Sequence, residues 1–398
     1  MKWLIAISVY LTVVIAGPNS NKTIPFALDL FQAADHGDPE QNFIISPLSP
    51  QILLAQLAEG CSKLARDELN RVVRLSSDEG KQLTDALTEI ANRNSAANKL
   101  DIASSIFKSD RLELSGKFKA ARKTSQIPIV NVDFSNKNKA AGQINQWAKQ
   151  MSRGNIPEIV TQDSLPNDAA MLLLNAIYFK GNWRYKFNET DTDRNGKFEA
   201  SKGHTIPVQM MTQSNKLRHG LVILDDEREL GLRWVELPYL GDELAMILML
   251  PTYRHELDSL LKQLTPEHME QIFNTIKHNY NPIKIHVKLP KFAIKNRVTL
   301  TEPLKKLGVK RIFEDNRALS EMFLTPTKVA DAMQDVFLSI DEQGATATAV
   351  SAVTTINLSL NPYQDMDFTC DEPFAVFVVD KVNRVPLFMA KIRQPSSQ

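Results

Sequence analysis

Residues 343–364 form a run of 22 residues without a single charged side chain, and this run restricts the possible folds more than any other feature. Its Gln, Thr, Ser and Asn residues are too frequent for a membrane span. Over residues 345–350, alanines alternate with β-branched residues, which is the period of a β-strand. No proline occurs before Pro362, so most of the run lacks the turn-forming residues of an ordinary exposed loop.

Two interpretations fit this run. It is either an edge strand with few bulky side chains to pack, or a segment that enters a sheet through a slot that accepts only small side chains. An uncharged edge strand with high β-propensity would be prone to aggregation unless the fold protected it. That hazard favours the second interpretation, but the pattern alone leaves both open.

The rest of the chain alternates between helical and strand-like patterns and contains no linker, repeat or block of like charge. Apolar spacing predicts helices over residues 27–34, 51–57 and 144–151, the second of them opened by Ser49-Pro50. Apolar runs predict strands over residues 130–134, 171–179, 234–251, 285–292, 336–340 and 374–379. The run 171–179 is almost wholly apolar, so we expect its strand to be buried on both faces. The sequence therefore predicts an α+β fold with one large domain over residues 17–398.

Composition and charge argue against several functions. Lys and Arg total 47 against 46 Asp and Glu, whereas a nucleic-acid-binding protein needs a clear basic excess. No phosphate-binding glycine motif, G-x-S-x-G or H-E-x-x-H occurs, which argues against a nucleotide-binding protein and a hydrolase. The seven histidines lack metal-binding spacing, and His286 alternates with apolar residues as a structural strand residue does. We therefore expect no enzyme activity, no metal and no cofactor, and we expect Cys61 and Cys370 to be buried free thiols.

The N-terminus has the pattern of a secretory signal peptide. Lys2 precedes an apolar run of about 14 residues, which is too short to span a bilayer, and small residues suit cleavage after Ala16. No later apolar stretch reaches the length of a membrane span. Three N-x-[ST] sequons, at Asn21, Asn188 and Asn357, agree with a secretory route. We therefore expect residues 1–16 to be removed and the remainder to be a secreted, extracellular glycoprotein.

Seven short motifs follow one another along the chain: residues 42–49 (NFIISPLS), 175–183 (NAIYFKGNW), 289–292 (LPKF), 304–313, 340–344 (IDEQG), 371–374 (DEPF) and 386–389 (PLFM). Together and in this order they resemble the motifs of the serpins, the serine protease inhibitor superfamily. The resemblance covers nearly the whole chain after the signal peptide. It implies a serpin fold with three β-sheets, about nine helices and an exposed reactive-centre loop at about residues 343–364.

The resemblance also implies a mechanism for the uncharged run. In an inhibitory serpin the target protease cleaves the loop as a suicide substrate, and the loop then inserts into the main sheet and traps the acyl-enzyme. Inward-facing positions must be small, and Ala345, Ala347, Ala349 and Ser351 all satisfy this requirement. The hinge residues implied by the family are Glu342, Gly344, Ala345, Thr346, Ala347, Thr348 and Ala349.

The family pattern further assigns residues that hold the main sheet closed, in what are called the shutter and the breach. They are Ser46, Ser49, Asn175, Trp183 and Gln334. The family usually has histidine where this chain has Gln334. Glutamine both donates and accepts hydrogen bonds, so we expect the shutter network to survive the replacement, with altered opening energetics.

The loop sequence restricts the target protease. No Lys or Arg lies between Lys328 and Lys381, so trypsin-like proteases, which select a basic residue, are not expected targets. Family spacing places the reactive bond at Leu358-Ser359, which suits chymotrypsin-like or elastase-like serine proteases. Papain-like cysteine proteases select an apolar residue one place earlier, and Ile356 before Asn357 provides one. Leu358 before Ser359-Leu360 provides another. The loop is about four residues longer than usual between Leu358 and Pro373, so a bond further along, near Asn361 or Tyr363, also fits, and its position stays open within about residues 356–363.

A non-inhibitory serpin, such as a carrier or storage protein, is the alternative function. Residues 76–93 contain four acids and only two bases, so we expect no strong glycosaminoglycan site. The expected partner is the target protease in a covalent complex, with no nucleic acid and no membrane. We expect the protein itself to be a monomer.

Overall fold

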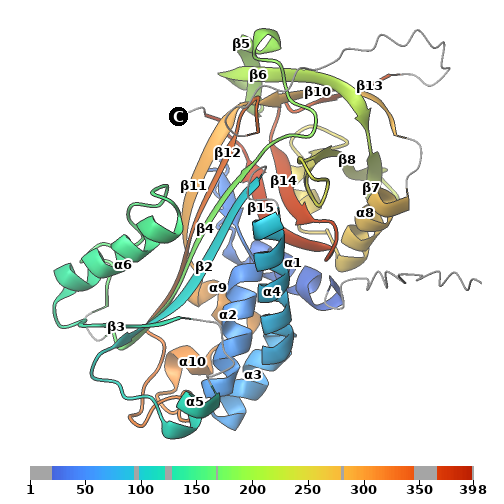
Figure 1. Ribbon diagram of the computed structural model, residues 1–398. Coiled ribbons are helices and arrows are strands. Elements are labelled where there is room, and N and C mark those ends of the chain that lie inside the picture. The colour runs from blue at the N-terminus through green and yellow to red at the C-terminus, as the bar shows by residue number, and fades with distance from the viewer. Residues whose placement is uncertain are drawn as a thin grey trace, which may run out of the picture.

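The structure is a computed structural model that describes residues 20–93, 98–121, 128–166, 169–278, 282–344 and 365–396. Three sheets organise these residues (Figure 1). The main sheet has five strands in the order β11 (Phe292–Thr299), β12 (Asp331–Ile340), β4 (Met171–Gly181), β2 (Asn98–Ser109) and β3 (Ile129–Val132). The expectation of three sheets is confirmed, and the described residues contain ten α-helices where about nine were expected.

Two smaller sheets complete the β-structure. The six-stranded sheet has the order β1 (Phe43–Ile45), β15 (Val385–Ile392), β14 (Phe374–Asp380), β9 (Leu244–Pro251), β8 (Leu230–Pro238) and β7 (His219–Asp225). The four-stranded sheet has the order β13 (Met366–Thr369), β10 (Ile283–Pro290), β6 (His204–Leu217) and β5 (Asp193–Ser201). Strand β13 begins two residues after the uncharged run and pairs with β10 in the four-stranded sheet.

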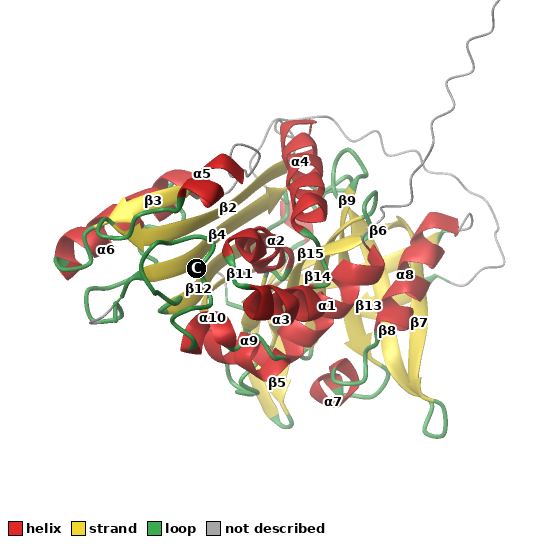
Figure 2. Ribbon diagram, turned by 90° about the horizontal axis from the view of Figure 1, so that it is seen from below, coloured by secondary structure: helices red, strands yellow, loops and turns green. Residues whose placement is uncertain are grey.

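Helices cover both faces of the main sheet. Helix α6 lies on one side of it and α2 and α4 on the other (Figure 1). Helices α1, α2 and α3 gather between the main sheet and the six-stranded sheet, where they bury a continuous apolar core (Figure 2). The helices are α1 (Ser20–Ala34), α2 (Leu48–Leu57), α3 (Lys63–Val73), α4 (Ser77–Arg93), α5 (Gly116–Ala121), α6 (Lys137–Met151), α7 (Leu257–Leu261), α8 (Pro266–His278), α9 (Thr301–Leu307) and α10 (Arg311–Glu314).

Strand β4 confirms the expectation of burial on both faces. Ten of its eleven residues are buried, because one face contributes to the large core and the other to a second core beneath α6. Leu173 and Ile177 belong to the first core, whereas Leu172, Leu174 and Ala176 belong to the second. An uninterrupted apolar sequence is what such a central strand needs.

Several boundaries differ from the predictions. The predicted strand 234–251 is a hairpin of β8 and β9, because the chain turns where Gly241 and Asp242 adopt positive φ angles of 95° and 60°. The predicted strand 285–292 is likewise divided at Lys291 between β10 and β11. Several elements begin earlier than predicted, among them α1 at Ser20, α2 at Leu48, α6 at Lys137 and β12 at Asp331. Polar residues extend α6 and β12 beyond their apolar patterns.

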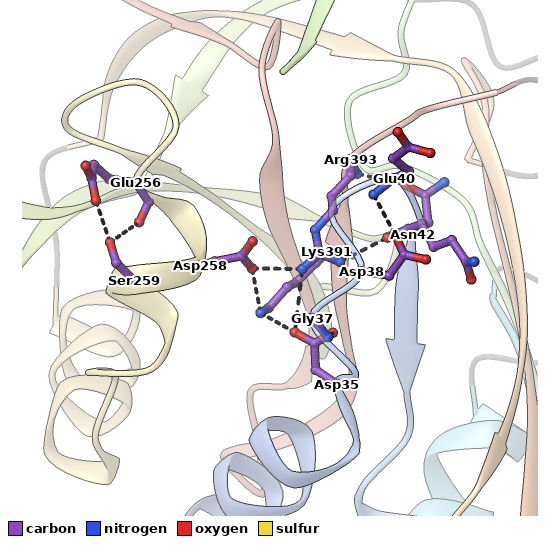
Figure 3. Close-up of polar contacts among 11 residues, drawn as sticks. Asp35, Gly37, Asp38, Glu40, Asn42, Glu256, Asp258, Ser259, Lys391 and Arg393 are labelled. Carbon is purple, nitrogen blue, oxygen red and sulfur yellow. Dashed lines mark hydrogen bonds and ion pairs between the residues drawn. The ribbon is translucent and has the colours of Figure 1, made fainter. Parts of the chain in front are cut away.

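The C-terminal strand is fixed by a cluster of buried charges. Lys391 Nζ contacts Asp35 Oδ2 at 2.5 Å and Asp258 Oδ1 at 2.8 Å, and Arg393 Nη2 contacts Asp258 Oδ1 at 2.8 Å (Figure 3). Both cations are nearly inaccessible to solvent. Burial opposes ionisation of Asp35, but the hydrogen bond and charge of Lys391 outweigh it and lower its pKa. The cluster therefore ties β15 to the ends of α1 and α7.

Candidate functional site

The candidate site is the junction between β4 and β12 in the main sheet. These strands are parallel neighbours, with Asp331 opposite Leu172 and Leu338 opposite Phe179. Parallel strands end at the same edge, so the ends of β4 at Gly181 and β12 at Ile340 lie together (Figure 1). The uncharged run begins a few residues beyond this edge, at the mouth of the junction.

Gly344 makes the closest backbone approach at this edge. Its φ of +76° lies in the left-handed region, and a Cβ atom there would stand 2.4 Å from Gly181 O and 2.5 Å from Trp183 N. No side chain fits at those distances, so this position requires glycine. The Gly344 amide also donates to Asp341 O at 3.2 Å, which closes a tight turn after β12. The predicted hinge residue Gly344 is therefore packed directly against the end of β4.

Trp183 holds the same turn from the other strand. Its indole Nε1 donates to Asp341 O at 2.9 Å, and its amide donates to Gln343 O at 3.3 Å. Its ring stacks on Tyr239, with 4.6 Å between centroids and 9° between planes, and both side chains are buried. The Phe187 amide adds a hydrogen bond to Glu342 O at 3.0 Å. The breach is therefore a rigid aromatic and hydrogen-bonded layer across the ends of β4 and β12.

Glu342 carries the charge of the breach. It is 5% exposed, and its carboxylate accepts hydrogen bonds from Lys291 Nζ at 2.8 Å and from Thr192 Oγ1 at 3.0 Å. Burial opposes ionisation of Glu342, but these hydrogen bonds outweigh it, so the pKa of Glu342 lies below its ordinary value. This buried acid is thus charged and paired, and it fixes the hinge to β5 and to the start of β11.

The shutter residues lie halfway down the same two strands, where Gln334 of β12 stands opposite Asn175 of β4. Gln334 Nε2 donates to Ser46 O, and its Oε1 accepts from Ser46 N, both at 2.8 Å. Ser49 Oγ donates to Asn175 Oδ1 at 2.7 Å, and Ser104 Oγ donates to the same oxygen at 2.8 Å. Within the described residues, no hydrogen bond joins Gln334 to Asn175.

The shutter therefore consists of two separate hydrogen-bonded groups, one of Gln334 with Ser46 and the other of Asn175 with Ser49 and Ser104. The side-chain amide of Gln334 both donates to and accepts from the backbone of Ser46, so both of its polar atoms are already hydrogen-bonded. Among the described residues, Ser46 Oγ and Asn175 Nδ2 are buried without hydrogen-bond partners. An unpaired buried polar group raises the free energy of the state that contains it. The closed form of this shutter is thus incompletely satisfied.

Several predicted site residues lie outside the described residues. They are the hinge residues Ala345, Thr346, Ala347, Thr348 and Ala349, the reactive-bond residues Leu358 and Ser359, the subsite residues Ile356 and Asn357, and the signal peptide 1–16. Asn21 lies in α1 and Asn188 precedes a 3-10 turn, and both are exposed.

Metal and membrane sites are not found in the part of the chain that the structure describes. No group of three His, Cys, Asp or Glu residues there could hold a metal ion. None of the helices described is both long and apolar enough to cross a membrane. Cys61 and Cys370 are buried free thiols, as expected, and burial raises the pKa of Cys61 to about 12. Both thiols are therefore unreactive.

The contributors to the site that the sequence analysis missed include Ser104, Gly181, Thr192, Tyr239 and Lys291. Gly181 and Lys291 belong to the motifs 175–183 and 289–292, so their presence in those motifs was a usable signal. Thr192 and Tyr239 carried none, because their contacts with Glu342 and Trp183 join residues far apart in the chain.

Comparisons with known proteins agree with this architecture. The family profile described as "Serpin (serine protease inhibitor)" matches residues 21–395. The leukocyte elastase inhibitor of Homo sapiens is 30% identical over 94% of this chain and 99% of its own length. The alaserpin of Manduca sexta is 31% identical over 93% of this chain and 92% of its own length. The crystal structure of Manduca sexta serpin-12 has a TM-score of 0.80 at 25% identity and covers 95% of this chain and 99% of its own.

A three-sheet fold with a glycine hinge at the end of a parallel strand pair, together with these matches, defines the class of protein. The chain belongs to the serpin family. Its homologues include protease inhibitors, which supports protease inhibition as the general function.

Proposed function

We propose that this protein is a secreted inhibitor that acts on proteases as a suicide substrate. The observation that supports this most strongly is the parallel pairing of β4 and β12 with Gly344 at their common edge. A segment that turned back at Gly344 and entered between these strands would be antiparallel to both. It would therefore form backbone hydrogen bonds along both of its edges.

In the proposed reaction the protease nucleophile attacks the carbonyl carbon of Leu358. The bond to Ser359 breaks, the Ser359 nitrogen takes a proton and leaves as an amine, and Leu358 stays bound to the protease as an acyl-enzyme. The loop, freed at Leu358, then enters the main sheet with the protease attached. At about 1 kcal/mol for each new hydrogen bond, insertion gains free energy comparable to that of folding a domain.

The proposed targets are chymotrypsin-like or elastase-like serine proteases, or papain-like cysteine proteases. Both classes form acyl-enzymes, so either can be trapped by the same step. Leu358 suits the first class, and Ile356 suits the second if the bond lies after Asn357. The uncharged run has no basic residue for a trypsin-like specificity pocket. The leukocyte elastase inhibitor relative is named for a target of the first class.

Secretion and glycosylation are part of the same proposal. The pattern of residues 1–16 supports removal of a signal peptide, and exposed Asn21 and Asn188 are accessible for glycan addition. A glycan on Asn357 would block access to the reactive bond, so we propose that this sequon is unused. We propose a monomer whose partner is the protease, without nucleic acid, membrane or a strong glycosaminoglycan site.

The test is incubation of the purified protein with chymotrypsin, elastase, a cathepsin-L-like protease and trypsin as the control. Denaturing gels should show a covalent complex with at least one of the first three, and mass spectrometry should find a released peptide that begins at Ser359 for a serine protease or at Leu358 for the cathepsin-L-like protease. Cleavage of the loop by every protease without a stable complex would contradict the proposal. That result would favour the non-inhibitory alternative, a carrier or storage protein.

A matched pair of loop variants tests the insertion step. Ala347→Arg places a charge on the face proposed to turn inward, whereas Thr346→Arg places the same charge one residue earlier, on the outward face. We expect A347R to be cleaved as a substrate, with the stoichiometry of inhibition raised about tenfold, because a buried unpaired charge opposes insertion. T346R should remain an inhibitor. Equal stoichiometries for the two variants would refute the assigned face.

A further inference from the structure

Asp335 is a buried acid that the proposed mechanism has not used. It follows Gln334 on β12, its side chain is 0% exposed, and it stands opposite Ala176 of β4. Because side chains alternate along a strand, it faces the second core, beneath α6, with Met333. Neither carboxylate oxygen has a hydrogen-bond partner among the described residues. A buried carboxylate in this state lacks the compensation that such groups normally have.

The ion pair available to Asp335 is a poor one. Arg297 is its register partner on β11, and the Arg297 Nε to Asp335 Oδ2 distance is 3.5 Å. The guanidinium also donates through Nη2 to the backbone oxygen of Glu158 in the segment after α6, and it is 37% exposed. Arg297 is therefore turned partly toward another acceptor, and its charge does not replace the lost hydration of Asp335.

The other charged or titratable groups around Asp335 do not compensate for its lost hydration either. Lys295 lies two residues from Arg297 on β11 and attracts the carboxylate from a distance. Strand β4 contributes no cation opposite it, and the nearest titratable side chain on that strand is Tyr178. Glu158 and Asp331 are of the same sign. Burial accordingly raises the pKa of Asp335, against the smaller opposing effect of Arg297.

We propose that Asp335 promotes loop insertion, because its buried carboxylate favours the separation of β12 from β4. The carboxylate raises the free energy of the closed sheet, because it is buried there without hydrogen bonds. Separation of the two strands admits water to this face, so the carboxylate regains hydration and the opened sheet is favoured. This role rests on the proposed function, in which insertion must outrun hydrolysis of the acyl-enzyme.

Asp331 provides a matched control on the same strand and the same face. Its Oδ1 accepts hydrogen bonds from Thr301 Oγ1 and from Ala332 N, so this half-buried carboxylate has the partners that Asp335 lacks. Burial still raises the pKa of Asp331 against these hydrogen bonds, so neutralisation of Asp331 should stabilise the closed sheet much less than neutralisation of Asp335 does. The two acids differ in partners more than in position, which makes the comparison specific.

The experiment measures how fast the full chain takes up a synthetic peptide of residues 345–357, which competes for the slot between β4 and β12. Asp335→Asn should slow this uptake about tenfold and raise the midpoint of thermal unfolding. Asp331→Asn should change both the midpoint and the uptake rate much less than Asp335→Asn does. Uptake by the unaltered chain should also slow as the pH is lowered from about 7 to about 4, because protonation neutralises Asp335, and D335N should lose most of this dependence.

Equal uptake rates and equal pH profiles for D335N and the unaltered chain would overturn the proposal. Asp335→Ala is the second variant, and failure of both variants to fold would also overturn it, since the acid would then be needed for the closed form. The outcome is separable from that of the proposed function. Loss of covalent complexes in the unaltered chain would refute inhibition, while the uptake comparison would still decide the role of Asp335.

Discussion

The breach and the shutter hold the same two strands together in different ways. At the breach, the buried acid Glu342 is paired with Lys291 and Thr192, and Trp183 is hydrogen-bonded through both its backbone and its ring. At the shutter, buried polar atoms of Ser46 and Asn175 lack partners among the described residues. The mouth of the slot also contains unpartnered atoms, Asn182 Oδ1 and the Tyr239 hydroxyl, but its buried charge is paired, whereas neutral hydrogen bonds alone hold the shutter residues. This difference predicts that the middle opens at lower cost than the mouth.

The largest expected effect tests the breach at its tightest point. Gly344→Ala should lower the free energy of unfolding by about 3 kcal/mol, because it adds both a left-handed alanine and a clash with Gly181 O. Gly203→Ala is the control, since Gly203 has a similar φ of +79° but open space around its Cβ position. It should cost only about 1 kcal/mol. Denaturant unfolding measures both, and equal losses would show that the close approach is unimportant.

Removal of the cation from the breach should have the next largest effect. Lys291→Met should cost about 2 kcal/mol, because it leaves Glu342 buried and charged with fewer partners. The double variant with Glu342→Gln should recover part of this loss, since the uncompensated charge is gone. Calorimetry of the two variants checks the prediction. No recovery in the double variant would mean that the packing of Lys291 matters more than its charge.

The same pair predicts a pH dependence with a defined sign. The pKa of Glu342 is lowered from its ordinary value of 4.5, so its contribution to stability is present above that pH and is lost as the pH falls below it. Acid unfolding of the unaltered chain and of K291M should therefore converge as the pH falls. A difference that stayed constant down to the acid limit would contradict this assignment.

At the shutter, Gln334→Ala should cost about 1.5 kcal/mol, less than the breach variants, because two backbone groups of Ser46 lose their partner. Thermal unfolding measures this cost. Gln334→Val is the control for side-chain packing, because it fills more of the site than alanine without restoring either hydrogen bond. A cost above that of K291M would reverse the comparison between the two regions.

The smallest expected effect is an energetic coupling near zero. Gln334 and Asn175 stand opposite each other, yet no hydrogen bond between them is found in the described residues. A double-mutant cycle with Q334A and Asn175→Ala should therefore give a coupling below about 0.5 kcal/mol. Gln334→His, which introduces the residue common in the family, should raise the coupling if it joins the two halves of the shutter. A large coupling in the present sequence would show that the halves already act together.

Local patterns located three of the five strands of the main sheet, β3, β4 and β12, but did not locate β2 or β11. The apolar run 171–179 located β4 because burial on both faces leaves no other composition possible. The hairpin of β8 and β9 was missed because its turn is short and is flanked by Leu240, which continues the apolar pattern. The start of β12 was missed because Gln334 and Asp335 are polar, although both are buried.

The site could be predicted only where a motif carried it. Gly344 and Glu342 were found because the family resemblance marks the hinge. The partners of Glu342 come from two distant segments, and Thr192 lies 150 residues away from it, so sequence spacing contained no signal for that contact. The two halves of the shutter were also beyond prediction, since the direction in which an amide points is decided by tertiary packing. The sequence analysis predicted that Gln334 can donate and accept hydrogen bonds, but only the structure shows that both of these bonds go to Ser46.

The ion pairs of Lys391 and Arg393 acquire a different significance if the proposed bond between Leu358 and Ser359 is cut. Residues 359–398 would then form a separate polypeptide, and Asp35 and Asp258 would belong to the other one. A label on the C-terminus would remain with the cleaved molecule on a gel-filtration column and would part from it only in denaturant. Size under native conditions would thus conceal the cleavage, and an intact elution volume would say nothing about whether the inhibitor had been spent.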